Sequence, residues 1–179
     1  MKFPRLVRKA VIALSFVGMA TTFGGQSADA ATEVSNLTVD ATVLSSCTIS
    51  TAPVNFGTYD PLGTHNTNPL DNSAGQVRIT CANGLPVVVR LGQGATPAAG
   101  STAAAPDRQM AGPAPGDVLS YNLFTDAPGG IVWGDTAGTG VARVGTGLLD
   151  TVFIHGRVPG GQNPAAGAYA DTVVASVDF

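Results

Sequence analysis

Basic residues are scarce in this sequence, and beyond residue 30 lysine is absent altogether. That part of the chain has five arginines against eleven acidic residues, which gives a net charge of −6. Proteins that bind nucleic acid need a basic surface to neutralise phosphates, and five scattered arginines do not form one. The charge balance therefore argues against nucleic acid as a partner.

Catalytic and metal-binding patterns are missing as well. The sequence contains only two histidines and two cysteines, and it has no Gly-x-Ser-x-Gly nucleophile motif. His65 and His155 lack a second ligand at zinc-site spacing, so we interpret them as a solvated loop side chain and an ordinary strand residue. Gly92-Gln93-Gly94 lacks the third glycine and the helix of a phosphate loop. The sequence predicts no enzyme activity, no cofactor and no metal.

Two weaker binding hypotheses remain at the level of sequence. One is a calcium site built from the oxygen-bearing side chains Asp60, Asp71 and Asn72. Their spacing is not that of a regular calcium loop, so charged turns are the favoured interpretation. The other is a carbohydrate-binding face built from Trp133, Tyr121 and Tyr59. Aromatic side chains more often pack in cores and turns, and this role is favoured here too.

The first thirty residues have the three-part pattern of a secretory signal peptide. A basic start is followed by the apolar run 10–20 and by the small residues of Ala28-Asp29-Ala30. The run is shorter than the roughly 20 residues that a membrane-spanning helix needs. We expect cleavage before Ala31, followed by export.

Cys47 and Cys81 are the only cysteines of this exported chain. In an oxidising compartment a structural disulfide is the default for such a pair. A metal-binding or redox pair would favour closer spacing, such as Cys-x-x-Cys, together with further ligands. We predict a disulfide that stabilises the fold by about 3–4 kcal/mol.

Alternating apolar residues and frequent turn residues predict an all-β domain after residue 46. Glycine (23 residues) and proline (12) are abundant, and no helical apolar period is found. Strands are expected at 47–56, 76–81, 87–91, 119–124, 131–133, 148–158 and 169–179. Loops are expected at 57–75 and 92–117, the latter alternatively as two short irregular strands. Asn83-Gly84 predicts a hairpin between 76–81 and 87–91. A β-sandwich is the favoured architecture, and a barrel is second.

Residues 33–46 form a further strand pattern that has no neighbouring hairpin partner. One face of this segment carries the apolar residues Leu37, Val39, Ala41 and Val43, whereas the other face is polar. At the other end, the sandwich is expected to finish within a strand at Phe179, leaving a sheet edge open. Alternation alone favours equally a segment that folds back onto its own domain and a segment that is donated to another molecule.

The chain beyond residue 46 resembles the spore coat protein U domain family. The resemblance rests on segments that occur in the same order: Cys47-Thr48-Ile49, Phe56-Gly57-Thr58-Tyr59, Gly75-Gln76-Val77-Arg78-Ile79-Thr80-Cys81, Val87-Val88-Val89-Arg90-Leu91-Gly92-Gln93-Gly94, Arg108-Gln109-Met110, Leu119-Ser120-Tyr121-Asn122-Leu123-Phe124-Thr125-Asp126, Trp133-Gly134-Asp135 and Gly167-Ala168-Tyr169-Ala170-Asp171-Thr172-Val173. Members of this family resemble subunits of archaic (Csu-type) chaperone–usher pili.

The resemblance implies an incomplete immunoglobulin-like β-sandwich that is completed by donor-strand complementation. The chain would then comprise a signal peptide (1–30), an N-terminal donor strand (31–46) and a pilin domain (47–179). A shaft or adaptor subunit of a surface pilus is expected, with roles in attachment and biofilm formation.

The partners implied by the resemblance are identical or related subunits, a periplasmic chaperone and an outer-membrane usher. The chaperone would hold the C-terminal carboxylate at Phe179 during export through the periplasm. The alternative function is a self-completed secreted coat or matrix protein.

Overall fold

The computed structural model describes residues 31–179, and the predicted signal peptide, 1–30, lies outside the described residues. The chain divides into two units, Met1–Asp40 and Ala41–Phe179, and the fold below is that of the second. Residues 31–46 form no strand, and each of them is exposed. No helix found within 31–179 has the length and apolar character needed to cross a membrane.

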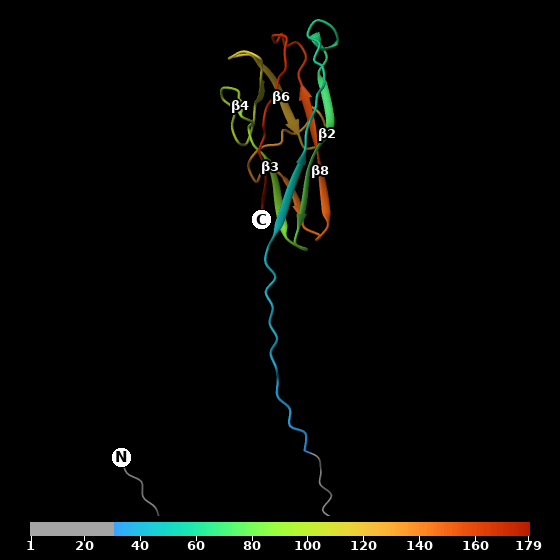
Figure 1. The fold of residues 1–179 in the computed structure, drawn as a ribbon, viewed down its shortest axis with the longest axis vertical. Coiled ribbons are helices and arrows are strands. Elements are labelled where there is room, and N and C mark those ends of the chain that lie inside the picture. The colour runs from blue at the N-terminus through green and yellow to red at the C-terminus, as the bar shows by residue number, and fades with distance from the viewer. Residues whose placement is uncertain (1–30) are drawn as a thin grey trace, which may run out of the picture. The chain divides into compact units, whose positions relative to one another are not determined.

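The folded unit is all-β, with nine strands and one short 3-10 helix within residues 41–179. These elements are β1 (Cys47–Ala52), η1 (Thr64–Asn66), β2 (Leu70–Cys81), β3 (Pro86–Leu91), β4 (Thr96–Pro97), β5 (Arg108–Ala111), β6 (Val118–Phe124), β7 (Val141–Val144), β8 (Leu149–Val158) and β9 (Ala175–Asp178). They form a six-stranded sheet with the order β1-β2-β8-β6-β5-β4 and a three-stranded sheet with the order β7-β3-β9 (Figure 1). This is the predicted immunoglobulin-like sandwich architecture, in which β1 and β9 are edge strands.

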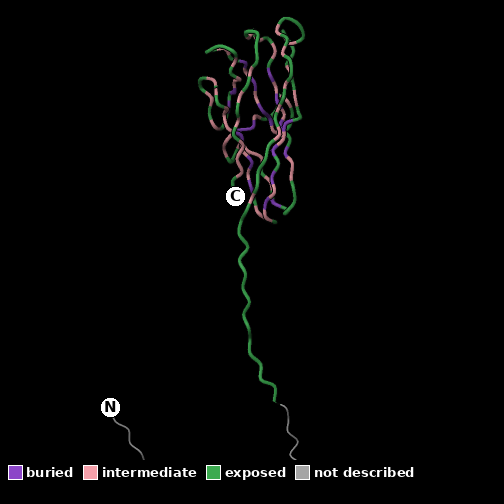
Figure 2. The backbone as a smooth tube through the Cα atoms, viewed as in Figure 1, coloured by how far each residue is buried: buried purple, intermediate pink, exposed green. Residues whose placement is uncertain are grey.

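The core lies between the two sheets, where alternate residues of the long strands point inward. The buried apolar residues include Val77, Ile79, Val87, Val89, Leu91, Leu119, Leu123, Trp133, Val152, Ile154 and Val158. Figure 2 shows these buried positions as purple stretches in the interior of the domain. Burial of each large apolar side chain contributes about 1.5–3 kcal/mol to folding.

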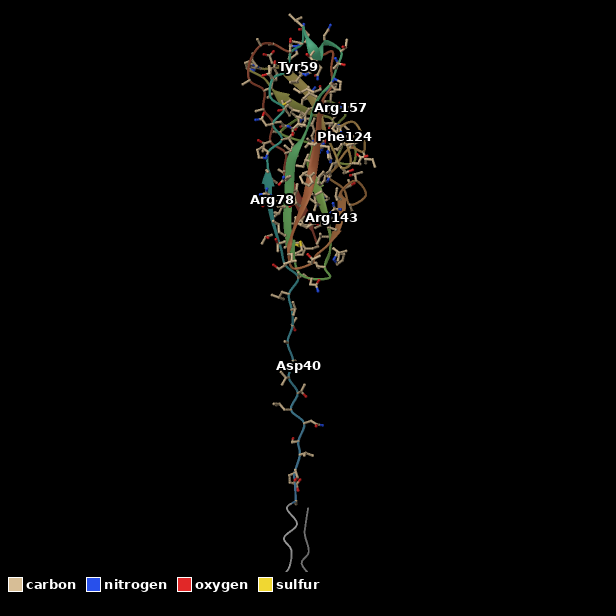
Figure 3. All side chains as sticks on the ribbon, turned by 90° about the vertical axis from the view of Figure 1, so that its right-hand side faces the viewer. Asp40, Tyr59, Arg78, Phe124, Arg143 and Arg157 are labelled. Atoms are coloured by element: carbon tan, nitrogen blue, oxygen red, sulfur yellow. A yellow bond between two sulfur atoms is a disulfide. The ribbon has the colours of Figure 1, made fainter. Side chains whose placement is uncertain are left out.

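The predicted disulfide between Cys47 and Cys81 is confirmed. The two cysteines are direct partners in the antiparallel β1–β2 ladder. Their sulfur–sulfur bond is the yellow bond in Figure 3. The bridge therefore fastens the edge strand β1 to its neighbour β2.

The predicted hairpin between 76–81 and 87–91 is wrong. Gly84 does adopt the left-handed backbone of a tight turn, with φ 77°, and the Leu85 amide donates to Ala82 O at 3.2 Å. However, β2 and β3 lie in different sheets. The turn carries the chain across the sandwich, where Gly84 N donates to Gly145 O at 2.8 Å. A turn dipeptide specifies a local reversal, and long-range pairing decides which strands become neighbours.

Some strand boundaries also differ from the sequence prediction. Residues 70–75 were expected in a loop, but β2 begins at Leu70, and a register shift between Asn72 and Gly75 accommodates its turn-forming residues. Strand β7 lies in a stretch for which no strand was predicted. The predicted strand 131–133 is reduced to one bridge between Val132 and Phe124. The loop 92–117 contains the two short strands of the alternative prediction, β4 and β5.

Candidate functional site: an open groove along the edge of the sandwich

An open groove of about 890 Å³ runs along the side of the sandwich where both sheets end. Its first wall is formed by residues within 51–61, which continue from β1, and its second wall by residues within 164–175, which lead into β9. The floor between the walls is apolar and consists mainly of Leu70, Leu91, Met110, Leu119, Tyr121, Leu123, Ile154 and Val158. The groove therefore runs along the core of the domain, although most of its floor residues are at most 6% exposed because side chains of the walls pack over them.

The first wall lies directly on the inner face of the six-stranded sheet. Val54 and Phe56 pack over Gly75 of β2 and Gly156 of β8, where a Cβ atom would collide with these two side chains. Glycine is therefore required at both positions for the wall to lie this close to the sheet.

Tyr59 lines the groove and lies near one end of the domain in Figure 3. Its hydroxyl donates to Pro159 O at 3.0 Å and accepts a hydrogen bond from Gln162 N at 3.1 Å. Its ring stacks on His65 with centroids 4.9 Å apart, and His65 Nδ1 accepts the amide proton of Asp60 at 2.8 Å. His65 is therefore part of the turn structure, and its interpretation as a merely solvated side chain was wrong.

Both walls have backbone groups without strand partners. Within the described part of the chain, residues 53–59 form no backbone–backbone hydrogen bond. In the second wall, among the same described residues, the stretch 164–174 forms such bonds only at Ala170 and Val174. Backbone amides and carbonyls need partners when they are buried. Some of these groups have side-chain partners, among them Asn55 O, Gly57 N and Ala165 O. The groove thus has two edges with few backbone–backbone hydrogen bonds beside an apolar floor.

A buried arginine side chain links backbone segments on the interior side of the groove. Arg108 is fully buried and donates to Leu91 O, Gly92 O and Trp133 O at 2.7–3.0 Å. It also donates to Asn122 Oδ1 at 2.7 Å. Burial lowers the pKa of Arg108 to about 10, so it remains charged at neutral pH. Sequence reasoning missed this role, because a single arginine in a short strand has no periodic signal of burial.

Tyr121 and Asp171 meet at the groove, and sequence reasoning did not single them out as a pair. Tyr121 is only 6% exposed, and its hydroxyl donates to Asp171 Oδ2 at 2.6 Å. Burial, followed by the contact with the Asp171 carboxylate, raises the pKa of Tyr121 well above its ordinary value. The phenol therefore remains protonated, and it remains the donor of this hydrogen bond.

The carbohydrate-binding face considered above is contradicted by the structure. Trp133 is completely buried, and its indole N–H donates to Val89 O at 3.0 Å. Tyr121 is buried as well. Two of the three aromatic side chains are thus committed to the core, as the favoured interpretation expected.

The residues considered for calcium are engaged with protein groups. Asp60 Oδ1 accepts the amide proton of Gly63 at 2.9 Å within a turn. Asp71 forms an ion pair with Arg157 at 2.7 Å, and the Asn72 amide donates to the backbone oxygen of Asn55 at 2.8 Å. Within residues 31–179, no three His, Cys, Asp or Glu side chains gather as metal ligands.

The predicted donor residues and the predicted chaperone anchor are all exposed. Leu37, Val39 and Val43 are 83–89% exposed, and Ala41 is exposed too. Phe179, which follows β9, is 59% exposed. Their assignments as donor side chains and as anchor stay predictions.

The end of β9 is held by a charged contact. The Arg90 guanidinium donates to Asp178 Oδ1 at 2.6 Å and forms an ion pair with Asp135 at 3.2 Å. The Asp178 interaction, foremost a side-chain hydrogen bond, raises the pKa of Arg90. This contact keeps the residue before Phe179 attached to β3.

Comparison with known proteins gives consistent matches. The model of the Spore Coat Protein U domain family matches residues 33–176. Protein U of Myxococcus xanthus is 41% identical over 178 residues, which cover 97% of this chain and 98% of that protein.

One solved structure with a similar fold is the complex of CsuC and CsuE, a chaperone–tip adhesion subunit pre-assembly complex from the archaic chaperone–usher Csu pili of Acinetobacter baumannii. It is 25% identical with a TM-score of 0.54, and the match covers 77% of this chain and 40% of that chain. The chain thus spans less than half the length of the solved chain that it resembles.

Proposed function

Because the chain belongs to the spore coat protein U domain family, we propose that it is a structural subunit of a chaperone–usher pilus. It polymerises by donor-strand exchange, as a shaft or adaptor subunit. Residues 31–46 act as the donor strand, and the groove of the next subunit receives them. The function is structural rather than catalytic.

The groove is the observation that carries this proposal. It combines an apolar floor with two walls that form few backbone–backbone hydrogen bonds. A strand that enters such a site gains main-chain hydrogen bonds on both sides and buries alternate side chains in the floor. Residues 37–43 provide this pattern, with apolar side chains at every second position.

The apolar donor face contributes part of the free energy that holds two subunits together. Burial of Leu37, Val39, Ala41 and Val43 contributes at most about 5–9 kcal/mol, before the ordering of the segment is subtracted. The donor and acceptor surfaces are different parts of the same molecule. Such a head-to-tail contact does not close on itself and yields a filament.

Before assembly, a periplasmic chaperone supplies the missing strand, and an outer-membrane usher exchanges it for the donor segment of the next subunit. Phe179 is the proposed anchor through its carboxylate. The solved complex supports a chaperone partner, because it contains a chaperone bound to a subunit of a related pilus. The contact between Arg90 and Asp178 presents the chain end to the chaperone in a fixed position.

The filament is exported through the periplasm to the cell surface, where it supports attachment and biofilm formation. The predicted signal peptide supports export. The disulfide is consistent with an oxidising compartment.

A second candidate function is a secreted coat or matrix protein that is completed by its own chain. The full-length similarity to Protein U and the name of the family favour it. This function requires that a segment of the same molecule fills the groove.

An SDS gel of surface-sheared material, run with and without boiling, separates the two functions. Donor-strand exchange predicts a ladder of subunit multiples that collapses to the monomer on boiling, because kinetically trapped strands resist detergent at ambient temperature. A single monomer band under both conditions contradicts the pilus proposal and favours the coat protein.

A further inference from the structure

Asp171 connects the second wall of the groove to two separate points of the fold, Tyr121 in β6 and Ala95 just before β4. One carboxylate oxygen, Oδ2, accepts the hydroxyl proton of Tyr121 from β6 at 2.6 Å. The other, Oδ1, accepts the amide proton of Ala95, which lies in the loop between β3 and β4 and immediately precedes β4, at 2.8 Å. Since β6 and β4 belong to the same six-stranded sheet, a single side chain fastens this wall to that sheet at two places.

Tyr121 extends the connection to the first wall. Its ring lies in the floor of the groove and meets the ring of Phe56 edge-on, with centroids 6.1 Å apart and planes at 66°. Phe56 lines the first wall. The chain of contacts Phe56–Tyr121–Asp171 therefore crosses the groove beneath the space that a strand would occupy.

Hydrogen bonds from Arg108 hold the backbone on the inner side of this chain of contacts. Arg108 fixes the carbonyl groups of Leu91 and Gly92, just before the loop that reaches Asp171. Gly94 has φ 88°, and a Cβ atom there would collide with the Asp171 carboxylate. The loop approaches the carboxylate closely because this position is glycine.

Besides Asp171, the second wall has backbone–backbone hydrogen bonds only at Ala170 and Val174 within the described residues, together with the packing of Tyr169 and Val173 against the core. We propose that Asp171 is the positioning residue that keeps the second wall in place while the groove is empty, so that an incoming strand finds a formed site. This inference rests on the proposed strand-exchange function and adds the residue that prepares the groove.

Asp171 stabilises the position of the second wall more in the empty groove than in the filled one. Once a donor strand is bound, its own ladder of hydrogen bonds holds the wall. Without the tether, only a fraction of empty grooves has the wall in the receptive position, and strand capture slows in proportion to that fraction. Dissociation starts from the filled groove and is expected to change little.

The test uses the mature chain, residues 31–179, carrying Val39→Asp, so that its own segment does not fill the groove of another copy. A fluorescently labelled peptide of residues 33–46 is added, and its association and dissociation rates are measured by anisotropy. Adding Asp171→Asn or Tyr121→Phe should slow association about tenfold, the effect of losing one hydrogen bond to a carboxylate. The dissociation rate should remain close to that of the Val39→Asp parent.

Asp126→Asn is the matched control, because the Asp126 carboxylate accepts the Ile131 amide proton in a turn outside the groove. It removes the same charge and should leave both rates unchanged. Tyr121→Phe keeps the ring and its packing, and it remains informative if Asp171→Asn fails to fold.

The outcomes distinguish this inference from the proposed function. Equal association rates in all variants overturn the role of Asp171 while strand capture itself stands. Another result is a variant that associates more slowly and also dissociates faster by the same factor. This result also overturns the role of Asp171, because the residue would then stabilise empty and filled grooves alike. Failure of the Val39→Asp parent to bind the peptide overturns strand exchange, and the inference with it.

Discussion

Polar groups buried in the sandwich are satisfied by partners distant in sequence. Arg108 reaches the carbonyl groups of Leu91 and Trp133, which come from different parts of the chain. A buried charge without such partners would cost several kcal/mol. Arg108 therefore helps to determine how the β3 end and the loop at 133 are arranged, in addition to filling space.

The buried phenol of Tyr121 predicts a loss of stability in alkaline solution. Its pKa is raised in the folded state by burial and by Asp171, whereas an unfolded tyrosine ionises near pH 10, so above about pH 10 the unfolded chain releases a proton that the folded chain keeps. The stability that Tyr121 contributes is fully present below pH 10 and is lost as the pH rises.

The measurement is the free energy of unfolding in urea between pH 9 and 11.5 for the wild type and Tyr121→Phe. The wild type should lose about 1.4 kcal/mol per pH unit more than the variant. The lowered pKa of Arg108 acts in the opposite direction, but it is present in both proteins and largely cancels. Parallel stability curves would contradict the raised pKa of Tyr121.

At the residue scale, the sequence was sufficient where a role depends on one residue type and its compartment. The disulfide between Cys47 and Cys81 was predicted in this way. The Tyr121–Asp171 bond was not, because the two residues lie 50 positions apart and only the closed fold brings them together. The same limit applied to Trp133, whose burial follows from packing and not from its neighbours in sequence.

Strands with alternating apolar residues were the most predictable elements. β6 and β8 agree with the sequence prediction to within a residue or two. The errors fell where local turn chemistry and long-range pairing disagree, as at Asn83-Gly84, or where polar residues are tolerated in a strand. The first residues of β2 are such a case, because Asp71 is neutralised by Arg157 across the ladder to β8.

The β1 strand depends on its disulfide more than the inner strands do. It is an edge strand whose middle residues are exposed, so apolar burial contributes little to its position. Replacing both Cys47 and Cys81 by serine should lower the free energy of unfolding by about 3–4 kcal/mol, since the bridge closes a loop of 34 residues.

Urea unfolding monitored by the fluorescence of Trp133 measures this loss. The wild type treated with a reductant is the control and should approach the double variant, which itself should not respond to the reductant. An unchanged urea midpoint in the double variant would show that β1 is held without the bridge. Because β1 continues into the first wall, the variant should also bind the 33–46 peptide more weakly.

At the scale of the whole molecule, the proposed subunit has two separate functions, donation and acceptance. The exposed apolar residues at 37–43 and the open groove are different regions of one chain. Under the proposed function, a second copy completes both without any new surface. The sequence indicated the alternating apolar pattern at 37–43, but the shape of the groove emerged only from the folded arrangement of 51–61 and 164–175.

The separation of the two functions predicts that a subunit defective in donation alone terminates filaments. Val39→Asp places a charge on the apolar face of the donor segment, and burying it in the groove would be unfavourable. Its own groove is unchanged, so it still accepts a strand from a wild-type subunit. When the variant is co-expressed with the wild type, the mean filament length seen by electron microscopy should fall as the fraction of variant rises.

Thr42→Asp is the matched control, because it adds the same charge to the polar face of the same segment. Filaments should form with it at nearly the wild-type length. Equal shortening by both variants would mean that a charge anywhere in the segment disturbs assembly. It would contradict the assignment of the apolar face as the face that enters the groove. Normal filaments with Val39→Asp expressed alone would contradict the donor assignment, because a chain that cannot donate has no means of joining the next subunit.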